Sequence, residues 1–121
     1  MPTAGSVLII DEDVATVDVI TDVLNDEGYR AFGVASDTVV HIAAVQPPPA
    51  VILLDVRRRD TIAIARVAAC AAIPIVLMTT ASGSGVGALL TMPGVVACLS
   101  KPFVIDDLLA YVACYVQPSQ A

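Results

Sequence analysis

The sequence predicts a single α/β domain built on a parallel β-sheet that carries helices on both faces. Three observations support this fold class: the chain has 121 residues, short apolar runs alternate with helix-like segments, and 57% of the residues are hydrophobic. A chain of this length holds one hydrophobic core. A β-α unit repeated five times favours parallel strands. The domain is expected to span 1–121, with its core at about 6–116 and a tail or linker stub at 117–121.

Five segments, four of them apolar runs, are predicted to form the strands. Continuous apolar runs are typical of strands buried on both faces of a parallel sheet. The first, SVLII, ends in three consecutive acids. The predicted strands are residues 6–10, 29–34, 50–54, 74–78 and 95–99.

Helical spacing and capping residues predict the helices between these strands. In the first helix the apolar residues at helical spacing are Val17, Ile20, Val23 and Leu24, and Gly28 provides a C-terminal stop. The segment 84–92 gives the weakest helical signal because it is rich in glycine. The predicted helices are residues 14–27, a segment from 36–37 to the prolines at 47–49, 61–72, a turn or more within 84–92, and 105–116.

Charge and hydropathy exclude several classes of partner. The formal net charge is −6 and Lys101 is the only lysine, whereas binding to nucleic acid or an anionic membrane depends on clustered cations. The most apolar stretch, IAIARVAACAAIPIVLM, contains Arg66 and Pro74, so it is not expected to span a membrane. The N-terminus lacks the basic region of a signal peptide. We therefore expect a cytoplasmic protein that binds neither nucleic acid nor membrane.

The three cysteines, Cys70, Cys98 and Cys114, are widely spaced and lie in apolar sequence. They form no Cys-x-x-Cys pair. Cysteines of this kind usually act as small buried hydrophobic residues, so we expect all three in the core.

Polar residues follow most of the predicted strands at the point where each strand ends. In a doubly wound sheet the functional crevice lies at the carboxyl ends of the strands. Carboxylates that lie close together need a cation, and oxygen ligands suit Mg²⁺. The residues concerned are Asp11, Glu12 and Asp13 after the first strand, Asp55 after the third, Thr79 after the fourth and Lys101 after the fifth.

Four sequence pieces resemble the receiver domain of two-component response regulators, the CheY-like superfamily, and the resemblance covers nearly the whole chain. The pieces are VLIIDED, VILLDV, IPIVLMTT and LSKPF, in this order. The resemblance implies a (βα)5 flavodoxin-like fold with strand order 2-1-3-4-5. It also implies a phosphorelay signal-transduction function and a cis peptide before Pro102.

The resemblance assigns a role to each residue of the pocket. Asp55 would accept a phosphoryl group from a sensor histidine kinase or phosphotransfer protein. Thr79 and Lys101 would stabilise the phosphoryl oxygens. The Mg²⁺ ligands would be Asp11, Glu12, Asp55 and the backbone carbonyl of Arg57.

A receiver of this kind is not an enzyme beyond its own phosphotransfer and dephosphorylation. We expect it to signal through the face formed by segments 84–92, 95–99 and 105–116. The partner on this face would be an output domain or a second copy of the chain.

Several residues depart from the family pattern. The segment after Asp55 runs almost directly into a helix, and Cys98 stands where family members usually carry an aromatic switch residue. Thr80 replaces a typical alanine, and Glu12 replaces an aspartate. The arginine run Arg57, Arg58 and Arg59 is either a solvated loop or a source of extra cations for the phosphoryl group.

Two other functions remain open at this point. These departures allow a pseudo-receiver, a protein-interaction module that does not depend on phosphorylation. A haloacid-dehalogenase-like phosphohydrolase is a minor alternative, because Asp11 and Asp13 match the Asp-x-Asp motif of that family. Against it, Ala15 stands where that motif expects a hydroxyl residue, and the chain has no room for a cap.

Overall fold

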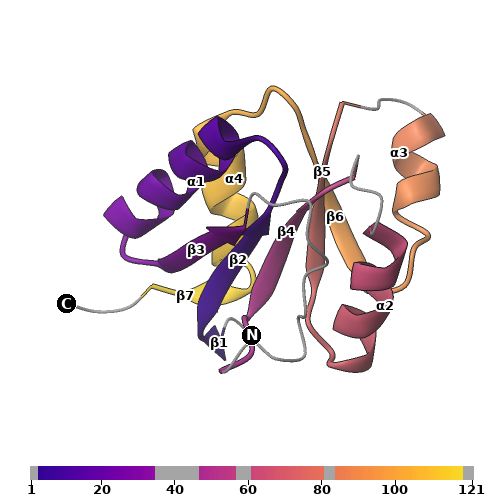
Figure 1. The fold of residues 1–121 in the computed structure, drawn as a ribbon, viewed down its shortest axis with the longest axis horizontal. Coiled ribbons are helices and arrows are strands. Elements are labelled where there is room, and N and C mark those ends of the chain that lie inside the picture. Colours follow the sequence, from indigo (N-terminus) through magenta and orange to yellow (C-terminus); the bar gives the residue numbers. More distant parts are fainter. Residues whose placement is uncertain (1–2, 35–46, 57–60, 81–83, 119–121) are drawn as a thin grey trace.

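The computed structural model describes residues 3–34, 47–56, 61–80 and 84–118. Its centre is a five-stranded sheet in the order β3-β2-β4-β5-β6, and every neighbouring pair is parallel (Figure 1). Counted along the chain, these five strands have the predicted order 2-1-3-4-5. Their bounds are β2 Ser6–Ile10, β3 Arg30–Val34, β4 Val51–Asp55, β5 Ile75–Thr79 and β6 Val95–Ser100.

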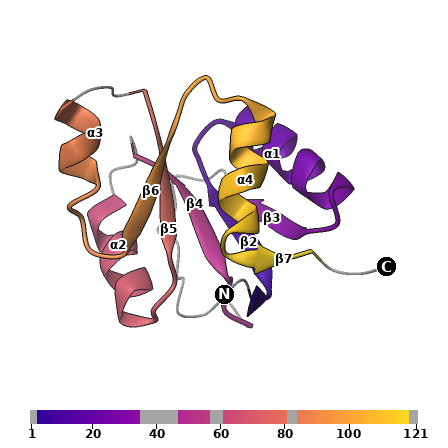
Figure 2. The same cartoon turned by 180° about the vertical axis from the view of Figure 1, so that it is seen from behind.

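Helices cover both faces of the sheet, as predicted (Figures 1 and 2). The helices α1 (Val14–Asp26) and α4 (Ile105–Ala113) pack on one face, while α2 (Thr61–Cys70) and α3 (Ser84–Leu89) lie on the other. Alternate residues of a strand point to opposite faces, so each central strand supplies both cores. In β2, for example, Val7 and Ile9 join the α1/α4 core, and Leu8 and Ile10 join the α2 core.

The prediction of a last helix over 105–116 is wrong at its C-terminal end. Helix α4 stops at Ala113, and β7 (Val116–Gln117) pairs in parallel with β1 (Thr3–Ala4). Val116 is buried, and it lies four residues after Val112, so its apolar character fits a longer helix equally well. Whether residue 116 continues the helix or forms a strand is decided by its pairing with β1. Local spacing in the sequence cannot reveal that pairing, because the partner strand lies at the other end of the chain.

The expectation that all three cysteines are buried is also wrong. Cys70 and Cys114 are exposed and Cys98 is half-buried. In α2 the buried face is formed by Ile64, Ala65 and Ala68. Cys70 is two residues beyond Ala68, which places it about 200° further around the helix and therefore on the solvent side.

Two predicted features lie outside the described residues: the helix from 36–37 to the prolines at 47–49 and the arginine run 57–59. Within the described part of the chain, no helix is both long enough and apolar enough to cross a membrane.

Gly33 in the edge strand β3 lies directly beneath α1, so replacing it by Ala is expected to destabilise the fold. A Cβ atom on Gly33 would lie 2.1 Å from Cγ1 of Val17, and a β-branched side chain has little freedom to move aside. We expect Gly33→Ala to lower the free energy of unfolding by about 1–3 kcal/mol, measured by urea denaturation.

Gly87 provides the matched control for this substitution. A Cβ atom there meets nothing within 4 Å, and the residue is exposed in α3. Gly87→Ala should therefore raise stability by at most about 1 kcal/mol through helix propensity. Equal effects of the two substitutions would contradict the close packing of α1 on β3.

Candidate functional site

The buried polar side chains of the described residues gather at the carboxyl edge of the sheet. They belong to Asp11, Asp55 and Thr79, which are 0%, 2% and 2% exposed. Asp55 and Thr79 are the last residues of β4 and β5, and Asp11 directly follows β2. In the parallel register Ile10 pairs with Leu54, so the next residues, Asp11 and Asp55, come side by side. The sequence correctly predicts that these residues meet at this edge.

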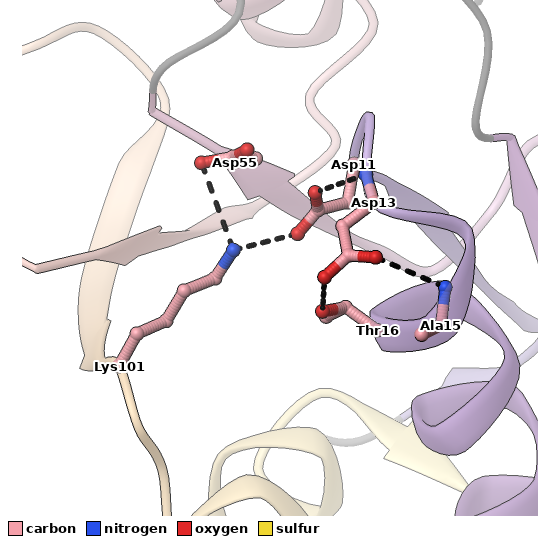
Figure 3. Close-up of polar contacts among 6 residues, drawn as sticks. All are labelled: Asp11, Asp13, Ala15, Thr16, Asp55 and Lys101. Atoms are coloured by element: carbon pink, nitrogen blue, oxygen red, sulfur yellow. Dashed lines mark hydrogen bonds and ion pairs between the residues drawn. The ribbon is translucent and has the colours of Figure 1, made fainter.

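Lys101 brings an ammonium group to the two buried carboxylates. It follows β6, and its Nζ lies 2.6 Å from Oδ2 of Asp11 and 3.8 Å from Oδ1 of Asp55 (Figure 3). The Lys101 side chain is itself only 13% exposed. Charges held this far from water attract each other more strongly than a surface pair. The only lysine of the sequence is therefore part of the site, as predicted.

A short hydrogen-bond chain fixes the backbone on the α1 side of the site. The Asp13 N–H donates to Oδ1 of Asp11 at 2.9 Å, so the Asp11 carboxylate contacts both Asp13 and Lys101. The Asp13 carboxylate caps α1 by accepting from the Ala15 N–H at 3.1 Å and from the Thr16 hydroxyl at 2.8 Å (Figure 3). Asp13 is thus a positioning residue, a role that the sequence analysis did not assign. The spacing Asp-x-x-Thr before an apolar helix could have indicated it.

The hydrogen bond from Thr16 lowers the pKa of the exposed Asp13 carboxyl below its ordinary value, with help from the backbone N–H groups that it caps. A carboxyl with a lower pKa in the folded chain stabilises the fold above its unfolded-state pKa. This contribution is lost as the pH falls through the folded-state pKa. The cap of α1 is therefore fully charged at neutral pH.

The backbone ties Lys101 to the strand that carries Thr79. The Lys101 N–H donates to the Thr79 carbonyl oxygen at 2.7 Å, and the Lys101–Pro102 peptide is cis, as the resemblance implies. This hydrogen bond fixes the backbone of Lys101 next to the end of β5, and thereby fixes the position from which its side chain extends.

The remaining predicted site residues lie further out. Glu12 and Thr80 are exposed, and the Arg57 carbonyl lies outside the described residues. Cys98 lies on β6, half-buried against the α2 side of the core. Burial raises the pKa of the Cys98 thiol, so this group stays protonated at neutral pH. The Cys98 side chain is small, so a change of its conformation would bury or expose less surface area than the same change of an aromatic side chain.

The donor set fits Mg²⁺ better than a softer metal. Asp11 and Asp55 supply buried carboxylate oxygens, with Glu12 next in sequence. In the described residues no group of three His, Cys, Asp or Glu side chains is arranged to hold a metal ion. Mg²⁺ is commonly held through one or two carboxylates together with substrate phosphates, and it retains several waters, so Asp11 and Asp55 are the described residues that could hold it.

An apolar groove beside the site was not anticipated from the sequence. It lies between α1 and the segment that joins β6 to α4, and Lys101 forms part of its lining. The sequence contains one signal for this groove, an apolar residue, Val19, that does not lie on the core-facing stripe of the helix. In the structure Val19 is 54% exposed, whereas Val17, Ile20 and Leu24 form the buried stripe. Helical spacing alone does not show what an apolar residue outside the stripe contacts.

Comparison with known proteins identifies the fold. No family model and no curated protein matches the sequence, but 280 chains of known structure match. The chemotaxis protein CheY4 of Vibrio cholerae is 20% identical, covers 93% of this chain and 99% of its own, and has a TM-score of 0.79. A CheY-like receiver domain from Methanospirillum hungatei is 21% identical, covers 91% of each chain, and has a TM-score of 0.76. The signal receiver domain of a histidine kinase from Syntrophus aciditrophicus is 20% identical, covers 92% of this chain and 89% of its own, and also has a TM-score of 0.76.

The chain therefore has the CheY-like receiver fold of two-component response regulators. The similarity extends over more than nine-tenths of the chain in each of these comparisons. It confirms the predicted fold class and strand order.

Proposed function

We propose that this protein is a phosphoryl-accepting receiver domain of a two-component system and that Asp55 is the acceptor. The observation that supports this most strongly is the group of Asp11, Asp55 and Lys101, in which the ammonium of a partly buried lysine lies within 4 Å of two buried carboxylates. A structural ion pair needs one carboxylate. A second carboxylate beside the same lysine gives the site a further group that can act as a nucleophile.

The reaction forms a bond between an Asp55 carboxylate oxygen and phosphorus. The bond from phosphorus to the donor, the imidazole nitrogen of a phosphohistidine, breaks, and its electron pair leaves with the nitrogen. Phosphoryl transfer depends mainly on positioning and on stabilising charge. Lys101 supplies a cation 3.8 Å from Oδ1 of Asp55, and Thr79 lies at the end of the adjacent strand with a hydroxyl that can donate to a phosphoryl oxygen.

Asp11, Glu12 and Asp55 would hold Mg²⁺ together with the backbone carbonyl of Arg57. A bound Mg²⁺ would neutralise the phosphoryl oxygens as they approach the carboxylates. Asp11 is held for this role by the Asp13 N–H, so its carboxylate keeps its orientation when Lys101 turns toward the phosphoryl group.

The phosphoryl donor would be a sensor histidine kinase or a phosphotransfer protein in the cytoplasm. The output surface would be the face formed by α3, β6 and α4, and it would contact an output domain or a second copy of the chain. Val96 on β6 is 44% exposed on the edge strand and provides apolar contact area there.

The test is incubation of the purified chain with acetyl phosphate and Mg²⁺, read by intact mass. We expect the wild type to gain one phosphoryl mass and Asp55→Asn to gain none, because an amide is not a nucleophile toward phosphorus. Removal of Mg²⁺ with a chelator should suppress the gain.

A wild-type chain that gains no mass would contradict the proposal. The pseudo-receiver function would then be favoured, since the small Cys98 side chain at the switch position gives little change in buried area on which a phosphorylation signal could act.

A further inference from the structure

The hydroxyl of Thr16 begins a continuous series of polar contacts that ends at the proposed acceptor. Thr16 donates to Oδ2 of Asp13 at 2.8 Å, and the Asp13 N–H donates to Oδ1 of Asp11 at 2.9 Å (Figure 3). The other oxygen of Asp11 accepts from Lys101, whose Nζ lies 3.8 Å from Oδ1 of Asp55. Thr16 is thus linked through Asp13 to both buried carboxylates.

The position of Thr16 in α1 explains why the Asp13 N–H is available to Asp11. Asp13 is the N-cap of α1, and Thr16 lies three residues after it. In the capping box, a common arrangement at this position, a Glu or Gln side chain accepts a hydrogen bond from the N–H of the N-cap residue. Thr16 instead donates to the carboxylate of the N-cap residue. The Asp13 N–H therefore bonds to Asp11 rather than back to the helix.

The orientation of the Asp11 carboxylate depends on this N–H. Asp11 is 0% exposed, and its two oxygens accept from the Asp13 N–H and from Lys101. Lys101 would turn toward a phosphoryl group, so the Asp13 N–H is the contact that would persist. Groups that hydrogen-bond to a metal ligand orient it, and loss of one typically weakens metal binding by about 10-fold to 100-fold.

We propose that Thr16 is a positioning residue of the acceptor site: by binding the Asp13 side chain it leaves the Asp13 N–H to Asp11, and so orients the Asp11 carboxylate for Mg²⁺. This inference rests on the proposed function of the site. The role differs from stabilisation of α1, because another side chain at this position could cap the helix equally well and still compete with Asp11 for the N–H. Helix stability and Mg²⁺ binding can therefore be changed separately at one position.

Thr16→Gln separates the two roles. A Gln side chain here completes a capping box, and its carbonyl oxygen competes with Asp11 for the Asp13 N–H. We expect the midpoint of urea denaturation not to fall, whereas the dissociation constant for Mg²⁺ rises about tenfold. This constant would be measured by isothermal titration calorimetry of the full chain with magnesium chloride and no phosphoryl donor. At subsaturating Mg²⁺, the rate of mass gain with acetyl phosphate should fall by a similar factor.

Three further variants isolate the hydroxyl group. Thr16→Val retains the β-branched shape and a similar helix propensity, so it removes only the hydroxyl, and it should weaken Mg²⁺ binding about fivefold. Thr16→Ser retains the hydroxyl and should bind Mg²⁺ as the wild type does. Thr91→Val is the matched control: the Thr91 hydroxyl donates to the Ala88 carbonyl oxygen at 2.6 Å beside α3, on the other face of the sheet. Its Mg²⁺ affinity should equal that of the wild type.

The outcomes separate this inference from the function on which it rests. Wild-type Mg²⁺ affinity in Thr16→Gln would overturn the positioning role, and so would equal losses of affinity in Thr16→Val and Thr91→Val. If the wild type binds Mg²⁺ but gains no phosphoryl mass, the proposed function fails, and the Mg²⁺ dissociation constants still decide the role of Thr16. A wild-type chain that binds no Mg²⁺ would overturn both.

Discussion

Replacing Lys101 by Met is expected to lower the free energy of unfolding by about 3 kcal/mol, because Asp11 and Asp55 then stay buried without the ammonium group between them. Methionine keeps the unbranched apolar stem of lysine, so the change in packing is small. The free energy of unfolding would be measured by urea denaturation at neutral pH. A loss of this size is a large share of the stability of a small domain.

Two further variants test whether this loss arises from charge. Adding Asp11→Asn to Lys101→Met should recover much of the stability, since a neutral amide needs no cation, and the double-mutant cycle then gives the coupling between the two groups. Arg66→Met removes an exposed cation from α2 and should change stability by no more than about 0.5 kcal/mol. If Lys101→Met costs no more than Arg66→Met, the buried ion pair does not stabilise the fold.

Lys101→Met should also slow the phosphorylation of Asp55 by acetyl phosphate by about 10²-fold to 10³-fold. The physical reason is loss of a preorganised cation at the position where the phosphoryl oxygens gather in the transition state, and removal of one such group typically has this effect. The rate would be followed by intact mass under conditions in which circular dichroism shows the variant to be folded.

Lys101→Arg separates the contribution of charge from that of shape. Arginine retains the charge, but its planar guanidinium does not fit a site built around a compact ammonium group. We expect its rate to lie between those of the wild type and Lys101→Met. A Lys101→Met rate within threefold of the wild type would show that Lys101 has no part in the transfer.

The strands and the pocket could be predicted because both leave a strong local signal. A strand buried on both faces must be apolar along its whole length, and such a run is easily seen in the sequence, as in 51–54. When the run ends abruptly on Asp55 or Thr79, the change marks the carboxyl edge of the sheet. Parallel topology then brings these strand ends together, so the partners of the site follow from the fold.

The features that sequence reasoning missed depend on contacts between distant segments or on the phase of a helix. The strand at Val116–Gln117 has its partner at Thr3–Ala4, which no local pattern can indicate. The exposure of Cys70 depends on which side of α2 meets the sheet. The groove needs α1 and the segment before α4 to be adjacent in space, and only the folded chain shows this.

We propose that the Asp11–Asp55–Lys101 site accepts a phosphoryl group on Asp55. It is tested most directly by treating the acetyl phosphate-treated chain with borohydride, which reduces an acyl phosphate to an alcohol, and locating the reduced residue by peptide mass spectrometry. We predict reduction at Asp55 and at no other aspartate. Reduction at Asp11 instead would indicate a haloacid-dehalogenase-like phosphohydrolase, and reduction at no residue would indicate a pseudo-receiver; either result would contradict the claim.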